Sequence, residues 1–195
     1  MRTRDTEKEK LVRENAIRLL VKDGFEGFSM GKLAKACTIS VATLYIYYKD
    51  KDDLIKQLGV EEVRRMMELM TKDFSPEMSF EEGLKKQWEN RAMYSLTNPC
   101  RAEFSEIILN SPHCNQVLTE VKSDLKVILE TFIKKAIKNK ELKPMPMAVF
   151  WSVAYGPLYN LLRFHKEAKI RGKSFQFSNE TMYQTLELVL KALKP

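Results

Sequence analysis

The stretch Ser40-Val-Ala-Thr-Leu-Tyr-Ile-Tyr-Tyr-Lys-Asp-Lys51 constrains the fold of this chain more than any other part of the sequence. Helix signals lie on both sides of it. A helical segment, 29–37, comes before it, and Asp50 and Asp53 have the spacing of a capping box that begins the next helix. A helix, a short turn and a second short helix that carries hydroxyl groups have the layout of a DNA-reading helix-turn-helix.

The composition favours an all-α protein. Of the 195 residues, 44% are hydrophobic and 30% are charged, which is typical of a globular chain and not of a disordered one. Glycine and proline occur only 7 times each, and the apolar residues recur mostly at helical spacing. We expect about nine helices, over residues 5–23, 29–37, 40–47, 51–73, 79–97, 99–110, 112–140, 146–167 and from 178 onwards.

The net charge of +7 suits a polyanionic partner such as DNA, but its distribution does not locate a binding face. Residues 1–60 contain 12 Lys and Arg against 9 Asp and Glu, and residues 61–195 contain 21 against 17. Because the positive excess is spread along the chain, charge gives only weak support to DNA binding.

Cys37, Cys100 and Cys114 show no metal-binding spacing, and an odd number of cysteines suits a reducing compartment. The N-terminal residues contain no apolar segment of a secretory signal, and no apolar run approaches the roughly 20 residues of a membrane span. We therefore expect a cytoplasmic protein that has no membrane partner, metal ion or cofactor.

The short helix at 40–47 needs its neighbours, because a helix of this length is not stable alone. We expect Leu44 to anchor it and five residues to face outward. These are Val41, Ala42, Thr43, Tyr45 and Tyr47. Small side chains at the start of the helix let its backbone approach a groove floor, and the Thr43 hydroxyl can bond a base edge or a phosphate. The two outward tyrosines can donate to phosphates, although packing is an alternative role that suits Tyr48.

Two residues that flank this short helix add to the expected DNA face. Ser29 is placed as the N-cap of the second helix, a role that is compatible with a phosphate contact. Lys51 begins the fourth helix, from which its ammonium group can make a charge-assisted bond to a phosphate.

Three segments resemble the N-terminal domain of the TetR family of transcriptional repressors over about residues 8–58. They are Phe25-Glu-Gly-Phe-Ser-Met-Gly-Lys-Leu-Ala-Lys-Ala36, Ile39-Ser-Val-Ala-Thr-Leu-Tyr-Ile-Tyr-Tyr48 and Lys51-Asp-Asp-Leu54. The resemblance implies a three-helix DNA-binding domain at 1–50, with its helix-turn-helix at 29–48, and a larger effector-binding and dimerisation domain at 51–195. The DNA-contacting roles of the family fall on Ser29, Ser40, Val41, Ala42, Thr43, Tyr45, Tyr47 and Lys51.

Three residues depart from the family's commonest pattern. Thr38 and Ala42 stand where glycine is usual, and Tyr48 stands where phenylalanine is usual. Thr38 must either make the turn without a left-handed conformation or adopt that conformation with strain, because a β-branched residue disfavours positive φ. Ala42 changes how closely the helix can approach DNA, so the operator that is read can change with it.

The fourth helix is rich in methionine, a residue that fills cores and also forms adaptable pocket walls. Both roles stay open for its three clustered methionines, Met66, Met67 and Met70. We expect a small, mainly apolar or aromatic effector among the fourth to eighth helices. The candidate lining residues are Met66, Met70, Trp88, Met93, Tyr94, Phe104, Ile108, Phe132, Trp151 and Tyr155.

The helix at 146–167 is apolar over much of its circumference, which indicates two packing partners. One is its own domain, and we expect the other to be a second copy of the chain. Gly156-Pro157 should kink this helix. The resemblance likewise implies a dimer interface formed by the last two helices. The candidate interface residues are Trp151, Tyr155, Leu158, Tyr159, Leu162, Met182, Leu186, Val189 and Leu190.

Nothing in the sequence indicates catalysis. It contains no Gly-rich phosphate loop, no Gly-x-Ser-x-Gly elbow and no HExxH motif, so we assign no catalytic or metal-binding residue. The main hypothesis is a homodimeric repressor that binds a palindromic operator in double-stranded DNA and is released by its effector. The alternatives are a DNA-binding regulator without an effector and, less favoured, a small α-helical enzyme in which Cys100, Cys114 or His113 reacts.

Overall fold

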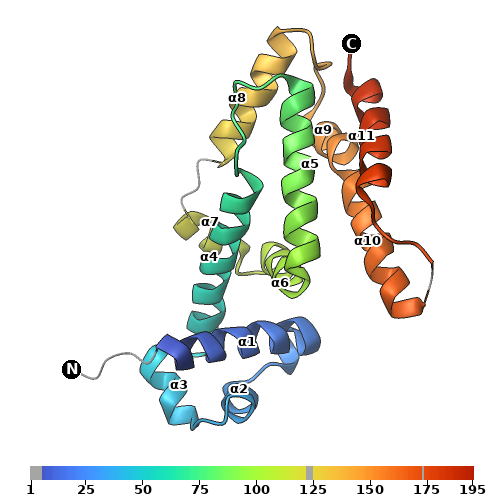
Figure 1. The fold of residues 1–195 in the computed structure, drawn as a ribbon. Coiled ribbons are helices and arrows are strands. Elements are labelled where there is room, and N and C mark those ends of the chain that lie inside the picture. The colour runs from blue at the N-terminus through green and yellow to red at the C-terminus, as the bar shows by residue number, and fades with distance from the viewer. Residues whose placement is uncertain (1–5, 122–124, 173) are drawn as a thin grey trace. The chain divides into compact units, whose positions relative to one another are not determined.

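The computed structural model describes residues 6–121, 125–172 and 174–195 of the chain. Within these ranges the chain forms eleven α-helices and no strand, so the expected all-α class is confirmed (Figure 1). The helices are α1 (Thr6–Gly27), α2 (Met30–Ala36), α3 (Val41–Tyr47), α4 (Lys51–Met70), α5 (Phe80–Thr97), α6 (Pro99–Leu109), α7 (Cys114–Val121), α8 (Leu125–Lys138), α9 (Met147–Ala154), α10 (Gly156–Arg171) and α11 (Asn179–Leu193). None of these described helices is both long and apolar enough to cross a bilayer.

The helices divide into two compact units. The first unit combines residues 1–66 with 98–123 and contains α1, α2, α3, most of α4, α6 and α7. The second unit combines residues 67–97 with 124–195 and contains α5, α8, α9, α10 and α11. These packing units do not follow the boundary expected at residue 50, because α6 and α7 pack with the N-terminal helices. The functional division into 1–50 and 51–195 stays a prediction.

The expected number of nine helices is too low for the described residues. The kink expected at Gly156-Pro157 is a full break, because Tyr155 (φ −122°, ψ −23°) separates α9 from α10. Proline has no N–H to donate, so the turn before Pro157 loses a helical hydrogen bond. α10 then continues to Arg171, beyond the expected end at residue 167, and closes at Gly172 in a left-handed conformation (φ 63°).

The segment 112–140, expected as one helix, contains α7 and α8. Its residues 122–124 lie outside the described ranges. α7 begins at Cys114 and not at the expected Pro112, because residues 111–113 form a turn. In this turn the hydroxyl oxygen of Ser111 accepts from the N–H of His113 at 3.2 Å.

α1 supplies the centre of the first unit, and one face of it contacts α2 and α6. The residues of that face recur at helical spacing and are at most 2% exposed, namely Val12, Ala16, Ile17 and Leu20. Leu33 of α2, Leu44 of α3 and Leu54 of α4 are fully buried in the same unit. α1 is interrupted at Gly24 (φ 68°, ψ −179°), in a conformation that glycine adopts without steric cost.

α5 is the central helix of the second unit and contacts α8 and α10 (Figure 1). α10 and α11 lie antiparallel, and α9 contacts both of them. The core between these helices is largely aromatic, with Phe80, Trp88, Phe132, Phe150 and Tyr155 at most 2% exposed. Gly83 lets α5 approach the Phe132 ring closely, since a Cβ atom on Gly83 would lie 2.4 Å from that ring.

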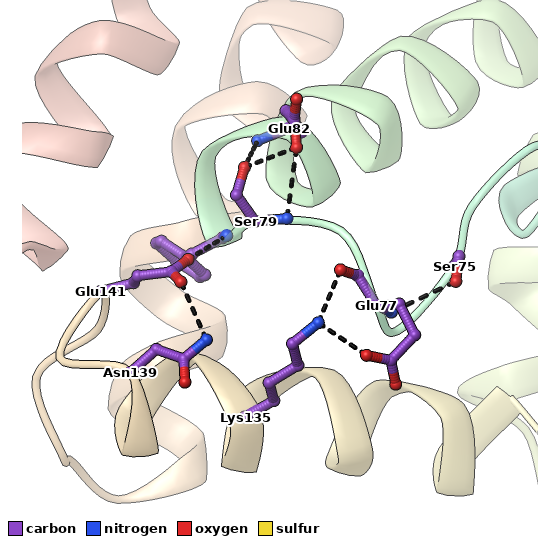
Figure 2. A network of polar contacts seen from close by, with 8 residues as sticks. Ser75, Glu77, Ser79, Glu82, Lys135, Asn139 and Glu141 are labelled. Carbon is purple, nitrogen blue, oxygen red and sulfur yellow. Dashed lines mark hydrogen bonds and ion pairs between the residues drawn. The ribbon is translucent and has the colours of Figure 1, made fainter.

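A polar network ties the start of α5 to the end of α8 (Figure 2). Ser79 and Glu82 form a capping box, in which the backbone N–H of each donates to the side chain of the other at 3.3 Å. The ammonium group of Lys135 donates to the carbonyl and the carboxylate of Glu77 at 2.6 and 2.8 Å. The Glu141 carboxylate accepts from the backbone N–H of Phe80 at 2.6 Å. These bonds fix the first turn of α5 within the second unit.

Candidate nucleic-acid interface

The expected helix-turn-helix is formed by α2, a tight turn and α3. Ser29 caps α2 by accepting from the N–H of Lys32 at 3.2 Å, and Ser40 caps α3 by accepting from the N–H of Thr43 at 3.1 Å. Both serines have the extended backbone that is usual at an N-cap. The Oγ of Ser40 also lies 2.9 Å from the Oγ1 of Thr43. Because both helices start at capped residues, the direction of α3 is well defined.

Thr38 makes the turn between the two helices in a left-handed conformation, with φ 55°. The N–H of Ile39 donates to the carbonyl of Ala34 at 3.0 Å, and the N–H of Thr38 donates to the carbonyl of Lys35 at 3.2 Å. This pair of bonds is the Schellman motif, in which glycine is usual at the left-handed position. A β-branched residue is strained there. Of the two possibilities for Thr38, the structure therefore has the strained turn.

α3 is anchored by one buried side chain and exposes most of the others. Leu44 is 0% exposed, as expected for an anchor, whereas Tyr45 is 53% and Ile46 is 73% exposed. The first two residues of α3 are exposed as well. Tyr48 follows the helix and is buried, which is the packing role expected of it, and burial raises the pKa of its phenol. The outer face of α3 thus begins with small side chains and continues with large apolar and aromatic ones.

The eight residues predicted to contact DNA lie at the caps of α2 and α3, on α3 itself and at the start of α4. Ser29, Ser40, Val41, Ala42 and Tyr45 are exposed, and Thr43, Tyr47 and Lys51 are half-buried. The hydroxyl groups of Ser29, Ser40 and Thr43 already take part in cap contacts, and a hydroxyl group has capacity for a further bond. The roles of all eight residues toward DNA stay predictions.

Lys51 has a structural partner that sequence patterns did not reveal. Its ammonium group donates to the carbonyl of Phe25 at 2.6 Å, and that of Lys32 donates to the carbonyl of Gly27 at 2.6 Å. Both carbonyls belong to the end of α1, where the last acceptors of a helix lack intrahelical donors. A phosphate contact by Lys51 would therefore use an ammonium group that also holds the end of α1.

Comparison with known proteins relates the helix-turn-helix to one family. Residues 12–58 match the family of bacterial regulatory proteins called the tetR family, a range that contains α2, the turn and α3 in full. A crystal structure of a TetR family transcription regulator from Marinobacter aquaeolei is 26% identical, covers 100% of this chain and 99% of that chain, and superposes with a TM-score of 0.81. The resemblance to the TetR family of transcriptional regulators is thereby confirmed for the N-terminal part of the chain. The resemblance expected over residues 8–58 agrees with the matched range except at its first four residues.

Curated relatives match shorter segments of this chain. An uncharacterized HTH-type transcriptional regulator of Haemophilus influenzae is 33% identical over 82 residues, which are 42% of this chain and 44% of that protein. A fatty acid metabolism regulator protein of Bacillus subtilis is 26% identical over 69 residues, which are 35% of this chain and 36% of that protein. The chain thus spans less than half the length of these two relatives. A TetR-family structure from Haemophilus influenzae, 22% identical over 100% of both chains with a TM-score of 0.74, shares the fold.

Ile46 is a residue of the outer face that was absent from the predicted DNA contacts. It lies two positions from the anchor Leu44, and two helical positions are about 200° apart around the axis. That spacing was the available signal, because it places Ile46 opposite the buried side of α3. With 73% of its surface exposed, Ile46 is the most exposed large apolar side chain of this helix.

The ten predicted effector-lining residues fall into both units. Met66, Phe104 and Ile108 belong to the first unit, and the other seven belong to the second. Within the second unit, the structure brings Met70, Trp151 and Tyr155 together around the guanidinium group of Arg91. Trp88 and Phe132 are core residues, Tyr94 is buried, and Met93 is 62% exposed on the surface of α5. As an effector site, the set stays a prediction.

Arg91 was missed although α5 carries a signal for it. Phe80, Leu84 and Trp88 recur every four residues on the buried face, and the next turn of that face falls at Arg91. Gln87 lies on the same side, and both polar residues are buried. Two long polar side chains on the apolar face of a helix are the pattern that points to a buried polar cluster.

Six of the nine predicted dimer-interface residues are buried in the chain's own core. Leu158, Met182, Leu186, Val189 and Leu190 are at most 7% exposed. Such residues have little surface left to bury against a second copy. Tyr155 is buried too, whereas Trp151 and Tyr159 are 37% and 43% exposed and Leu162 is half-buried. As a dimer interface, the set of nine residues stays a prediction.

None of the three cysteines forms a disulfide, and each lies in the first unit. Burial raises the pKa of the Cys37 and Cys100 thiols, which disfavours the reactive thiolate. The ring of His113 packs against the ring of Phe25 with 5.5 Å between centroids. These environments are those of packing residues and give no support to a cysteine nucleophile.

Proposed function

We propose that this chain is a DNA-binding transcriptional repressor that binds a palindromic operator as a homodimer and is released by a small effector. The observation that carries the proposal is α3, which Leu44 anchors while Tyr45 and Ile46 are exposed. The small side chains at the start of α3 let its backbone approach a groove floor, where apolar groups can meet thymine methyl groups. The exposed Tyr45 hydroxyl can donate to a phosphate on the wall of the groove.

A second copy is supported by the surface of the last two helices. Tyr159 and Phe164 of α10 are 43% and 45% exposed, and Tyr183 and Leu188 of α11 are 38% and 67% exposed. A second copy packed on α10 and α11 would remove part of this exposed apolar area from water. A dimer joined there carries two helix-turn-helix motifs, and motifs of this kind read half-sites about 34–36 Å apart.

The proposed effector is small and mainly apolar or aromatic. The name of the Bacillus subtilis relative ties that protein to fatty acid metabolism, and the similarity supports an apolar metabolite for this chain as well. Release from DNA requires that the effector bind the DNA-free geometry more tightly than the DNA-bound one, because equal affinity shifts no equilibrium.

A regulator without an effector is the second candidate, and the packing of the predicted lining residues favours it. Trp88, Phe104 and Phe132 are at most 1% exposed. Hollows of about 650 and 500 Å³ lie in the second and the first unit, and neither is lined by any of the ten predicted residues. A thermal-shift screen separates the two candidates, since a ligand of the native state raises the melting temperature.

A gel-shift titration tests the DNA-reading face, on DNA that the protein selects from a random pool. Tyr45→Phe removes one exposed hydroxyl group from α3, and we expect operator binding to weaken about 10-fold. Thr131→Val removes one exposed hydroxyl group from α8 and should leave the affinity unchanged. Wild-type affinity in both Tyr45→Phe and Ile46→Ala would show that α3 does not read DNA.

The solution mass of the protein tests the dimer separately. At micromolar concentration we expect a mass of two chains, because exposed apolar surface on α10 and α11 is buried by association. A single-chain mass at that concentration would remove the basis for a two-headed operator complex.

A further inference from the structure

The second unit contains a buried positive charge without a negative partner. Arg91 of α5 is 3% exposed, and no carboxylate of the described residues pairs with it. Its Nη1 contacts the sulfur of Met70 at 2.7 Å and the hydroxyl of Tyr159 at 3.4 Å. Buried guanidinium groups are normally paired with an anion, because removing a charge from water is costly. The thioether and the hydroxyl are neutral and leave the charge uncompensated.

Aromatic rings surround the same guanidinium group. Its central carbon lies 4.4 Å from the ring centroid of Tyr155 and 5.7 Å from that of Trp151. Cation–π contacts of this kind stabilise a cation against the ring faces and leave its N–H groups free to donate in the guanidinium plane. The arrangement holds Arg91 in place without using its full donor capacity.

Two polar atoms beside this charge have no hydrogen-bond partner. The Nε of Arg91 is a buried donor without an acceptor, and the Oε1 of Gln87 is a buried acceptor without a donor. Gln87 is 0% exposed and uses its Nε2 to donate to the carbonyl of Met70 at 3.1 Å, so its amide cannot turn without losing that bond. Gln87 and Arg91 are one helical turn apart, and therefore lie on one side of α5.

We propose that this cluster binds the carboxylate of a small aromatic or otherwise apolar acid, with Arg91 as the residue that recognises the anion. The Nε edge of a guanidinium group matches a carboxylate with two parallel hydrogen bonds. The unpaired Oε1 of Gln87 accepts from a hydroxyl or N–H group next to that carboxylate. The rings of Trp151, Tyr155 and Tyr159 contact the apolar body of the acid. This inference rests on the proposed effector-responsive function and names the chemistry of the effector.

The guanidinium group of Arg91 lies beside the break between α9 and α10. Tyr155 is the residue at the break, and the carbonyl of Ala154 beside it accepts from the indole N–H of Trp88 at 2.8 Å. Trp151 and Tyr159, on either side of the break, are 37% and 43% exposed and are the residues of the cluster that reach the surface. Both are also predicted dimer-interface residues, so a bound acid changes the surface that meets the second copy. The site thereby couples effector binding to dimer geometry.

Matched ligands test the proposal on the full-length protein. The probes are 3-phenylpropanol, 3-phenylpropionate and 3-phenyllactate, which share one body and carry no carboxylate, a carboxylate, and a carboxylate with a neighbouring hydroxyl group. Decanol and decanoate form an aliphatic pair. By calorimetry and thermal shift, we expect each acid to bind about 10- to 100-fold more tightly than its alcohol, and phenyllactate to bind most tightly.

Arginine variants test whether Arg91 causes the preference for acids over alcohols. Arg91→Met keeps the length and the packing of the side chain and should abolish the preference for acids, while Arg91→Lys keeps the charge and should retain part of it. Arg163→Met makes the same change at an exposed arginine of α10 and should retain all of it. Equal affinity for acids and alcohols, no binding of any acid at millimolar concentration, or an unchanged preference in Arg91→Met would overturn the proposal.

Operator binding distinguishes this inference from the function on which it rests. If the protein binds its selected operator but none of the acids, the carboxylate site is wrong and the DNA-binding function stands. If the acids bind through Arg91 and leave operator affinity unchanged, the site stands and effector-controlled release is wrong.

Discussion

Arg101 of the first unit and Arg91 of the second hold their charges in different surroundings. Arg101 pairs with the carboxylate of Glu62, a side chain that is 1% exposed, and Arg101 itself remains partly exposed. Arg91 is 3% exposed and contacts a thioether, a hydroxyl and two aromatic rings. A paired charge contributes to the fold of its unit, whereas an unpaired buried charge costs stability and is retained for something else. The first unit thus contains a paired buried charge, and the second unit contains an unpaired one, which the proposed acid would neutralise.

Arg101→Met removes the cation of the Arg101–Glu62 ion pair and should give the largest change in the free energy of unfolding. It leaves the buried Glu62 carboxylate without its cation, and we expect the free energy of unfolding to fall by about 3 kcal/mol. Urea unfolding followed by circular dichroism measures the change. Lys134→Met removes a cation that is exposed on α8 and provides the control, with an expected change within about 0.5 kcal/mol. A loss as small as the control's would show that the ion pair is not structural.

The destabilisation by Arg101→Met should depend on pH. Burial raises the pKa of the Glu62 carboxyl, and Arg101 lowers it in part. Without Arg101 the pKa rises further, so the folded state prefers protonated Glu62. Stability is then kept at low pH and lost as the pH rises through the folded-state pKa. Unfolding at about pH 5 should show a smaller loss than unfolding at about pH 8, and a loss that is equal at both pH values would contradict the assignment.

Arg91→Met should change the free energy of unfolding in the opposite direction. It removes an unpaired buried charge and fills the same space with an apolar chain, so we expect the free energy of unfolding to rise by about 1 kcal/mol. The same urea titration measures it. A loss comparable to that of Arg101→Met would mean that Arg91 contributes to the fold as Arg101 does, and the contrast between the two units would disappear.

A smaller change in unfolding free energy is expected at two helix ends, one in each unit. Thr38 after α2 and Lys140 after α8 are both left-handed, with φ 55° and 58°, and similar backbone bonds close both ends. Glycine relieves the strain at each position, and the β-branched Thr38 is the more strained of the two. We expect Thr38→Gly to raise the unfolding free energy by about 1 kcal/mol and Lys140→Gly by about half as much. Urea unfolding of the two variants measures both changes. Equal increases in unfolding free energy would mean that β-branching adds no strain at Thr38.

The helix starts could be predicted from the sequence because their causes are local. Ser29, Ser79 and Ser178 cap the helices that follow them, and each accepts from a backbone N–H three residues later. Gly156-Pro157 correctly predicted where the helix is interrupted, at Tyr155. It did not predict that the helix would break and not only bend, since one missing N–H can produce either.

The remaining features depend on contacts between distant parts of the chain. The periodicity of α11 shows that Met182 and Leu186 face apolar surroundings, but it does not say whether these belong to the same chain or to a second copy. The packing of α6 and α7 with the N-terminal helices has no local signal. The bond from Lys51 to the carbonyl of Phe25 has no local signal either, because the two residues are 26 positions apart.

Selection of bound DNA from a random pool tests the central claim most directly. Two α3 helices related by a two-fold axis should enrich an inverted repeat whose half-sites are centred about 10 base pairs, or a multiple of that distance, apart. The same selection with Leu44→Ala, which removes the buried anchor of α3, should enrich nothing. An inverted repeat bound by the wild type alone is the result that the account predicts. Enrichment of no sequence by the wild type, or of a single unrepeated site, would contradict it.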